Sequence, residues 1–427
     1  MSIKKVMKQI IPENLLNFYH KCQAILANII YGFPSKNLQI IGVTGTNGKT
    51  TTCYMIAKIL DEAGCKNAMI GTVFYKIGSH WQKNLSKMTT INPFVLQKFL
   101  RAAVNKNCRF VIVETTSHAI IQSRIWGLKF NTLVFTNLTH DHLDYHKTFN
   151  NYLNAKLKLF ADNPQALAVI NADDPHGVDF KKISKKNITY SLEGKGLVCA
   201  KKIKAYNDSS TFTIEWLGNQ VEAKINIAGF FNVANALAAF CVGANYNISP
   251  RAIAETLGKI KSISGRMEYL DFGQDYKIII DFAHTPDGLQ KVFETLKSTI
   301  HGKLIHVAGA TGDRDRTKRP ILGALAGKFA DIAIVTDEDP GKERPEDIIN
   351  KVAEGVERGA PKNNPKILGE NFFKIMDRAC AIKFALSIAK KNDVVLITGK
   401  GHEEVMAVGD KLVPYSDKKV VEEILKK

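Results

Sequence analysis

The sequence predicts an α/β protein made of two successive units, a central P-loop domain with a mostly parallel sheet and a smaller Rossmann-like α/β domain after it. Short apolar runs alternate with helical patterns from residue 38 to residue 171, which is typical of a parallel sheet covered by helices on both faces. A glycine-rich turn at 42–51 separates the first apolar run from the first helical pattern. A second series of the same kind begins near residue 263, and a chain of 427 residues is long enough for both cores.

The first unit shows two kinds of pattern. Its buried runs are bounded by helices, whereas the runs from about 185 to 228 are shorter and alternate between polar and apolar residues. In chain order, the expected elements are strands at 38–43, 110–114, 132–136, 166–171, 211–216 and 221–227, a helix at about 50–63, and helices at 232–246 and 250–259.

The strands of the second unit all end in polar or glycine-containing clusters. Because ligands of open α/β sheets bind outside the carboxyl ends of the strands, four such clusters indicate one shared site. The expected strands are 277–281, 304–308, 332–336 and 394–398. We therefore expect a short N-terminal helical segment at 1–37, a central domain at 38–262 and a C-terminal domain at 263–427.

The charge of the chain is strongly basic, with 59 Lys and Arg residues against 41 Asp and Glu residues and a net charge of +18. Such a charge suits nucleic-acid binding. The basic residues are spread along the chain, however, with no long Lys/Arg block and no aromatic-interleaved RNA motif. The preferred interpretation is a basic protein that handles anionic small molecules, and no nucleic-acid partner is expected.

The cysteine pattern and the N-terminal stretch indicate where the protein works. Seven scattered cysteines without a CxxC pair suit a reducing cytosol, and the N-terminus does not read as a signal peptide, so we expect a cytoplasmic protein. The apolar stretch 15–33 is interrupted by polar residues and is a poor membrane span. A helix packed on the body is favoured, and a helix lying in a membrane interface, which would give peripheral membrane proximity, is the alternative.

The turn Gly42-Val-Thr-Gly45-Thr-Asn-Gly48-Lys49-Thr50-Thr51 follows a strand and opens a helix, which is the context of a true phosphate-binding loop. Backbone N–H groups at a helix N-terminus face an anion there, and glycines let the backbone approach it closely. Lys49 can reach the outer phosphates and the Thr50 hydroxyl can ligate Mg²⁺. Val43 stands where the GxxxxGK[ST] pattern has its first glycine, so the glycines are out of register with that pattern. A plain strand-to-helix turn is the alternative.

The string from Gly45 to Thr51 resembles the Mur ligase family, which also includes folylpolyglutamate synthetase. Further motifs agree in order over nearly the whole chain after residue 36, and those of the last third are most similar to members that add the third peptide residue of peptidoglycan precursors. The motifs are Val113-Glu-Thr-Thr-Ser-His118, Thr136-Asn-Leu-Thr-His-Asp-His-Leu-Asp-Tyr-His146, Ala155-Lys-Leu-Lys-Leu-Phe160, Gly229-Phe-Phe-Asn-Val-Ala-Asn-Ala236, Gly265-Arg-Met-Glu268, Asp281-Phe-Ala-His-Thr-Pro-Asp287, Gly312-Asp-Arg-Asp-Arg-Thr-Lys-Arg-Pro320 and Gly399-Lys-Gly-His-Glu403.

The resemblance implies an ATP-dependent ligase. ATP would phosphorylate the terminal carboxylate of a UDP-N-acetylmuramoyl-dipeptide, and the amine of an amino acid would attack the acyl phosphate. The residues expected to contact ATP are Gly45, Thr46, Asn47, Gly48, Lys49, Thr50, Thr51, Asn232, Asn235, Arg266, Asp281, His284, Asp313, Lys318 and Arg319. A closing movement of the two domains is expected, since nucleotide and acceptor lie on different domains.

The catalytic set is expected to be Lys49, Glu114, His142 and Lys156, with two Mg²⁺ ions. Thr50 and Glu114 offer hard oxygen ligands to one ion. The resemblance implies that His142 and a carbamylated Lys156 hold the other. The residues alone allow simpler interpretations: a strand-end salt bridge for Glu114, a structural histidine, and a solvated helix face for Lys156.

The substrate contacts are expected at Thr89, Thr90 and Ser117 for the muramoyl peptide, and at Glu338, Asp339 and Glu403 for the amino acid. Two departures from the family pattern matter. Only about 37 residues precede the first strand, where typical members carry a uridine-binding domain, so the uridine end is held differently or the acceptor differs. The stretch 338–341 reads Glu-Asp-Pro-Gly where diaminopimelate-adding members have Asp-Asn-Pro-Arg, which favours a cationic side chain such as lysine.

Two alternatives stay open at this point. One is a related ligase, folylpolyglutamate synthetase-like or otherwise, with an acceptor that is not UDP-linked. The other is a basic P-loop protein that binds nucleic acid, which would explain the charge but would leave Glu114, Lys156 and the C-terminal motifs without a purpose. We expect a monomer that binds small-molecule substrates.

Overall fold

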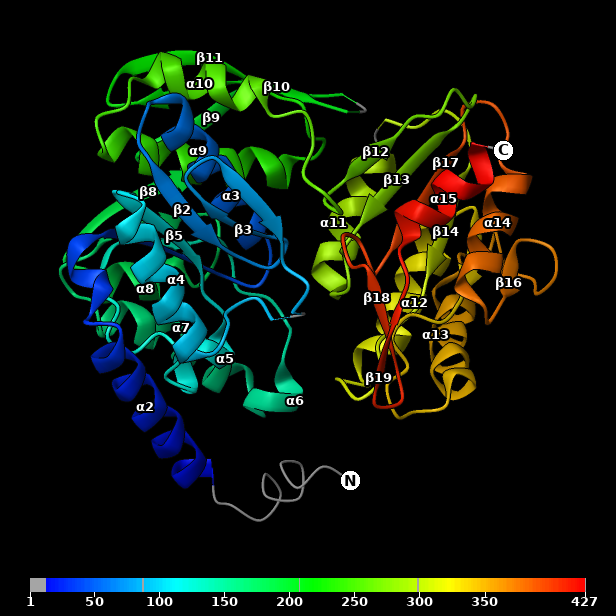
Figure 1. Ribbon diagram of the computed structural model, residues 1–427. Coiled ribbons are helices and arrows are strands. Elements are labelled where there is room, and N and C mark those ends of the chain that lie inside the picture. Colours follow the sequence, from blue (N-terminus) through cyan, green and yellow to red (C-terminus); the bar gives the residue numbers. More distant parts are fainter. Residues whose placement is uncertain (1–12, 87, 207, 298, 427) are drawn as a thin grey trace.

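The computed structural model describes residues 13–86, 88–206, 208–297 and 299–426. Two sheets organise these residues, and Figure 1 shows them side by side, with the first sheet and its helices on the left and the second on the right. The expected α/β class is confirmed.

The first sheet has 11 strands, and its centre is parallel. β1 lies between β5 and β6 and pairs with both in parallel, while the strand pairs at the two edges are antiparallel. In spatial order the strands are β11 (Asn219–Ile225), β10 (Ser210–Trp216), β9 (Val198–Ala205), β8 (Lys186–Ser191), β7 (Leu167–Asn171), β6 (Phe130–Phe135), β1 (Gln39–Thr44), β5 (Phe110–Glu114), β2 (Asn67–Ile70), β3 (Phe74–Ile77) and β4 (His80–Lys83). The alternating segment after residue 185 thus continues this sheet rather than forming a separate one.

Helices cover both faces of the first sheet, because the central strands are apolar on both sides. Ile41 and Val43 of β1 pack into one apolar cluster with α3, α9 and α10, while Ile40 packs into another with α4, α5, α7 and α8. The helices are α2 (Glu13–Ile30), η1 (Pro34–Asn37), α3 (Lys49–Glu62), α4 (Pro93–Asn105), α5 (Ser117–Ile121), α6 (Leu143–His146), α7 (Phe149–Ala161), α8 (Gly177–Ile183), α9 (Phe230–Asn245) and α10 (Pro250–Lys259).

The second sheet has six strands, parallel except for the β12–β13 pair. Its order is β12 (Glu268–Leu270), β13 (Lys277–Asp281), β17 (Val394–Thr398), β14 (Leu304–Ala308), β15 (Ile332–Val335) and β16 (Phe372–Lys374). The parallel neighbours β13, β17, β14 and β15 bring the carboxyl ends of all four expected strands to one edge of the sheet, as predicted.

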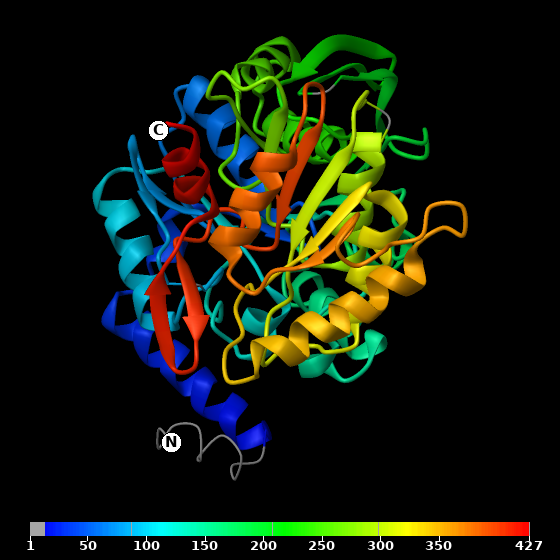
Figure 2. The same ribbon diagram turned by 90° about the vertical axis from the view of Figure 1, so that its right-hand side faces the viewer.

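Five helices and one hairpin complete the second unit. Helices α11 to α13 pack on one face of the sheet and α14 and α15 on the other (Figure 2). Their bounds are α11 (Pro286–Lys297), α12 (Lys318–Phe329), α13 (Pro345–Gly359), α14 (Arg378–Ile388) and α15 (Asp417–Leu425), and the hairpin consists of β18 (Val405–Val408) and β19 (Lys411–Pro414). In the part of the chain that the structure describes, no helix is both long and apolar enough to cross a membrane.

Candidate active site

The glycine-rich turn connects β1 to α3 at the carboxyl edge of the first sheet. Gly45 and Gly48 have φ values of 151° and 83°, and a Cβ at either position would collide with a neighbouring side chain, Thr136 or Asn235. Both positions therefore require glycine for conformation and for space. The Lys49 ammonium folds over the turn and donates to the carbonyl oxygens of Gly45 (3.1 Å) and Thr46 (2.7 Å), so the cation is already inside the loop.

Thr50 and Glu114 meet beside this turn. The Thr50 hydroxyl donates to Glu114 Oε1 at 2.9 Å, and Thr72 donates to both carboxylate oxygens, from its hydroxyl (2.8 Å) and from its backbone N–H (2.8 Å). Glu114 is buried, with 1% of its surface exposed. Its partners are hydroxyl and amide donors rather than a Lys or Arg side chain, so the strand-end salt bridge is not what the structure describes. Clustered hard oxygens are the donor set that Mg²⁺ prefers.

Lys156 lies on the other side of the turn, on α7. It is buried, and its ammonium donates to the Gly45 carbonyl at 2.8 Å and lies 4.6 Å from the centre of the Tyr152 ring. Lys158, two residues on, is exposed and pairs with Asp162. Burial, with the charge of Lys49 nearby, holds the pKa of Lys156 well below its usual value. Lys156 is therefore not part of a solvated helix face.

His142 lies close to both lysines. Burial lowers its pKa to about 3, opposed by Asp141 and reinforced by Lys49 and Lys156. Its backbone has φ 55°, in the left-handed region, and its ring is 3.3 Å from the Asp141 carboxylate. The lowered pKa favours the neutral imidazole, which is the form that can ligate a metal. The structure places His142, Lys49 and Lys156 in one cluster.

The second unit contributes charged groups to the same cluster. Arg266 donates from Nη2 to the Thr50 hydroxyl at 3.1 Å, and Asn47 of the turn donates to Asp287 at 2.9 Å. His284 and Lys318 both act on the buried Asp141: its burial alone would raise its pKa, but His142, His284 and Lys318 together hold it below the usual range. Groups from both units therefore converge around the phosphate-binding turn.

Comparison with known proteins agrees with this arrangement. Residues 43–243 match the Mur ligase middle domain, and residues 265–401 match the Mur ligase glutamate ligase domain. The UDP-N-acetylmuramoyl-L-alanyl-D-glutamate–2,6-diaminopimelate ligase of Clostridium tetani is 39% identical over 408 residues, which are 95% of this chain and 81% of the relative. The chain belongs to the Mur ligase family.

Two further relatives place this Mur ligase within the family. The UDP-N-acetylmuramyl-tripeptide synthetase of a Roseiflexus species is 36% identical over 410 residues, covering 92% of this chain and 80% of the relative. A solved structure of a UDP-N-acetylmuramoyl-L-alanyl-D-glutamate–2,6-diaminopimelate ligase superimposes with a TM-score of 0.63 at 31% identity, covering 91% of this chain and 78% of that one. The predicted similarity to members that add the third peptide residue is confirmed.

The expected nucleotide contacts of this Mur ligase separate into two groups. Asn232 and Asn235 of α9 bond to each other at 3.2 Å beside Thr52, one turn from the phosphate-binding loop, and Thr51 is buried in the first turn of α3. Asp281 accepts hydrogen bonds from the backbone of Met267 and Ala283, next to Arg266.

Arg319 and Asp313 are engaged elsewhere in the second unit. Arg319 is paired with Glu343 at 2.8 Å, and Asp313, which is exposed, receives the backbone N–H of Lys342. Their binding capacity is therefore partly used within the second unit, in contrast to Arg266 and Lys318.

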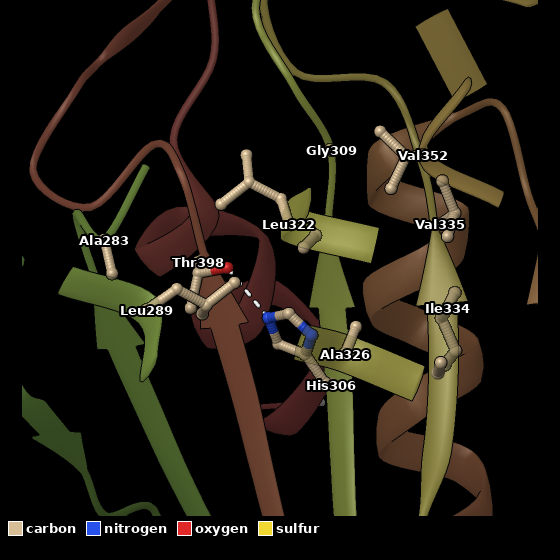
Figure 3. A pocket seen from close by; sticks show the side chains of 12 residues that line it. Ala283, Leu289, His306, Gly309, Leu322, Ala326, Ile334, Val335, Val352 and Thr398 are labelled. Atoms are coloured by element: carbon tan, nitrogen blue, oxygen red, sulfur yellow. Dashed lines mark hydrogen bonds between the residues drawn. The ribbon is translucent and has the colours of Figure 1, made fainter. Parts of the chain in front are cut away.

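The expected amino-acid contacts lie at the carboxyl edge of the second sheet. Lys400 is fully buried and pairs with Asp339 (2.9 Å) and Glu403 (2.5 Å). The Glu338 side chain is buried against Gly399 and Gly309, and its burial raises its pKa to about 7. Behind these strand ends lies the largely apolar pocket of Figure 3, where His306 and Thr398 are bonded at 2.9 Å. This edge therefore holds the carboxylates of Glu338, Asp339 and Glu403 beside Lys400, and Arg378 and Lys318 also act on Glu338.

The expected acceptor contacts lie close to the phosphate-binding turn. Thr89 shares a hydrogen bond with Thr72 at 2.9 Å, and Thr90 donates to the Glu114 carbonyl at 2.8 Å. Ser117 bonds to the His146 ring at 2.9 Å. The Thr89 and Thr90 hydroxyls therefore belong to the hydrogen bonds around Glu114, and the Ser117 hydroxyl belongs to those of the histidines.

Three residues of the site were not predicted from the sequence. Asp141 is buried among His142, His284 and Lys318, Thr72 holds Glu114, and Asp287 accepts a hydrogen bond from Asn47. Asp141 directly precedes His142, and Asp287 ends the motif that contains Asp281 and His284. Thr72 follows an apolar run in a loop, and nothing in its local sequence distinguishes it.

Proposed function

We propose that the chain joins an amino acid to the terminal carboxylate of a UDP-N-acetylmuramoyl-dipeptide at the expense of ATP. The observation that carries the proposal is the cluster in which Lys49, Glu114 and Lys156 of the first unit meet Arg266 and Lys318 of the second. Family membership supports the reaction class, and the names of the relatives supply the acceptor. The domain limits proposed for it are 38–262 and 263–427, after a helical segment at 1–37.

The reaction would proceed in two steps. A carboxylate oxygen of the acceptor attacks the γ-phosphorus of ATP, which releases ADP and leaves an acyl phosphate. The amine of the amino acid then attacks the acyl carbon, the C–N bond forms, and phosphate leaves as the amine loses its proton. Lys49 and Arg266 are placed to balance the charge of the phosphoryl group in transfer, which is where preorganised cations contribute most.

The residues present fit a metal requirement. Thr50 and Glu114 would hold one Mg²⁺, and His142 with Lys156 would hold a second if Lys156 carries a carbamate. Mg²⁺ supplies neutralisation of phosphate charge when it is bound. A buried lysine of low pKa fits carbamylation, because the neutral amine is the form that adds CO₂, and its carboxylate would replace a cation by an anion beside Lys49.

The amino acid is proposed to be a diamino acid. Glu338, Asp339 and Glu403 lie together at this edge, with Asp339 and Glu403 on the Lys400 ammonium, and carboxylates are the groups that recognise a second amino group. Lysine and diaminopimelate both offer one. Gly341 offers no side chain that could pair with the second carboxylate of diaminopimelate, so we propose lysine first and diaminopimelate second.

The proposed setting is the cytoplasm, with a monomer acting on small molecules and no nucleic-acid partner. The folylpolyglutamate-type alternative shares the fold at only 16% sequence identity, whereas the relatives with 36–39% identity carry muramoyl acceptors in their names. The nucleic-acid alternative would leave Glu114 and Lys156 buried without a task.

Release of phosphate from ATP tests the proposal. The full chain is incubated with Mg²⁺, ATP and UDP-N-acetylmuramoyl-L-Ala-D-Glu, with lysine, diaminopimelate, glutamate or no amino acid. We expect release that depends on both the dipeptide and a diamino acid. Release without the dipeptide, or with glutamate in preference, would overturn the substrate assignment, and no release with any muramoyl acceptor would overturn the function.

A further inference from the structure

Helix α2 exposes a continuous apolar face. Its exposed large side chains are 50–63% accessible: Leu15, Phe18, Tyr19, Leu26, Ile29 and Ile30. At 100° per residue these positions fall within an arc of about 120°. Scattered exposed apolar residues are ordinary, but a stripe along about four turns of one helix marks an interaction surface.

The opposite face of α2 is held firmly to the first unit. Ala24, Ala27 and Asn28 are buried, and Asn28 donates to the Trp126 carbonyl at 2.9 Å. Arg101 of α4 donates to the carbonyl oxygens of Tyr31 and Gly32 just after the helix. Figures 1 and 2 both show α2 (dark blue) at the lower end of the molecule. The exposed fractions of its large apolar side chains show that its apolar face is turned toward solvent.

The basic charge near this face favours an anionic partner. Lys21 and Lys36 are exposed on and just after α2. In the sequence alone, residues 1–36 contain five lysines and one acidic residue. The whole chain carries +18, so two copies would repel one another, whereas an anionic surface would attract the chain. A flat anionic surface that also accepts an apolar stripe is a lipid bilayer with acidic headgroups.

We propose that the exposed face of α2 lies in the interface of an anionic membrane. Leu15, Phe18 and Ile29 would enter the boundary between headgroups and acyl chains, and Lys21 would stay at headgroup level. The helix would lie on the membrane rather than cross it. The proposal does not depend on the reaction that the chain catalyses.

Co-sedimentation with vesicles tests the proposal. The full chain is mixed with vesicles of phosphatidylcholine alone, or of equal parts phosphatidylcholine and phosphatidylglycerol, at low and raised salt. We expect binding to the anionic vesicles that weakens with salt. The triple variant L15Q/F18Q/I29Q should bind about tenfold or more weakly, and Lys21→Glu about fivefold or more weakly.

The control is the double variant L217Q/L412Q, which removes two exposed leucines far from α2. It should bind vesicles like the unmodified chain. Because all the substituted side chains are exposed, circular dichroism and thermal melting should be unchanged in every variant. The proposal is overturned if the chain does not bind anionic vesicles, if the control loses binding equally, or if the triple variant instead abolishes a dimer seen by sedimentation equilibrium.

Discussion

Replacing Glu338 by glutamine should stabilise the protein at neutral and alkaline pH. Burial raises the pKa of this carboxyl from 4.5 to about 7, and only 3% of the residue is exposed. The unfolded chain loses this proton above pH 4.5, whereas the folded protein keeps it until about pH 7. Stability is therefore lost as the pH rises from 4.5 through 7, and the loss is constant at higher pH.

The size of the effect follows from the two pKa values. At about 1.4 kcal/mol for each unit of pKa, ionisation of Glu338 costs the folded protein about 3 kcal/mol. Of this cost, about 2.5 kcal/mol develops between pH 5 and pH 8. Glutamine has the same shape and no ionisable proton, so the advantage of Glu338→Gln over the unmodified chain should grow by that amount over the same interval.

Urea denaturation at pH 5 and at pH 8 measures this difference. Glu193→Gln, which changes an exposed carboxylate on the surface, serves as the control for the substitution itself. The reasoning is refuted if the Glu338→Gln advantage is equal at both pH values or shrinks at pH 8. If Glu338 also contacts the amino acid, the same variant should raise KM for the diamino acid, which is the trade of function against stability expected of a buried charge in a site.

Three other predictions concern single residues. Lys49→Ala should lower kcat/KM for ATP-dependent phosphate release on the order of 10²–10³-fold, while Lys129→Ala, an exposed lysine before β6, should leave it unchanged. Lys156→Ala should abolish ligation, and added acetate or propionate should restore part of it. Depleting bicarbonate should slow the unmodified enzyme. Lys158→Ala should keep full ligation activity, and full activity of Lys156→Ala would contradict the role of Lys156. Burial lowers the pKa of His306 to about 3, so the folded protein loses stability as the pH falls below 6.5. In the same denaturation assay, the free energy of unfolding of His306→Gln should therefore rise by about 2–3 kcal/mol relative to that of the unmodified chain between pH 7.5 and pH 4.5.

The sequence predicted most of the buried strands but missed the short buried strand β2, and it predicted the edges of the sheets poorly. The expected limits of β5, β13, β14 and β17 agree with the structure, because a strand buried on both faces must be apolar throughout and stops where polarity begins. The β18–β19 hairpin was not predicted: β19 is fully exposed and β18 is partly exposed, and runs of four residues are too short to distinguish such strands from a loop.

The sequence predicted many residues of the site but not the hydrogen bonds that join the two units. Lys49, Glu114 and Lys156 come from local motifs, and the structure brings them together. The bonds between the two units, such as Arg266 to Thr50 and Asn47 to Asp287, join residues more than 200 positions apart. No periodicity or motif encodes such pairs, because they depend on how two separately folded sheets are placed.

The Thr50 hydroxyl is the point at which these connections meet. A hydroxyl has one hydrogen and two lone pairs. The hydroxyl donates its hydrogen to Glu114 of the first unit, and one lone pair accepts a hydrogen bond from Arg266 of the second. One lone pair is left for a ligand. The hydrogen bonds of this one oxygen therefore depend on the first unit, on the second unit and on the ligand together. Serine at this position would keep the hydrogen and both lone pairs, whereas valine would have neither.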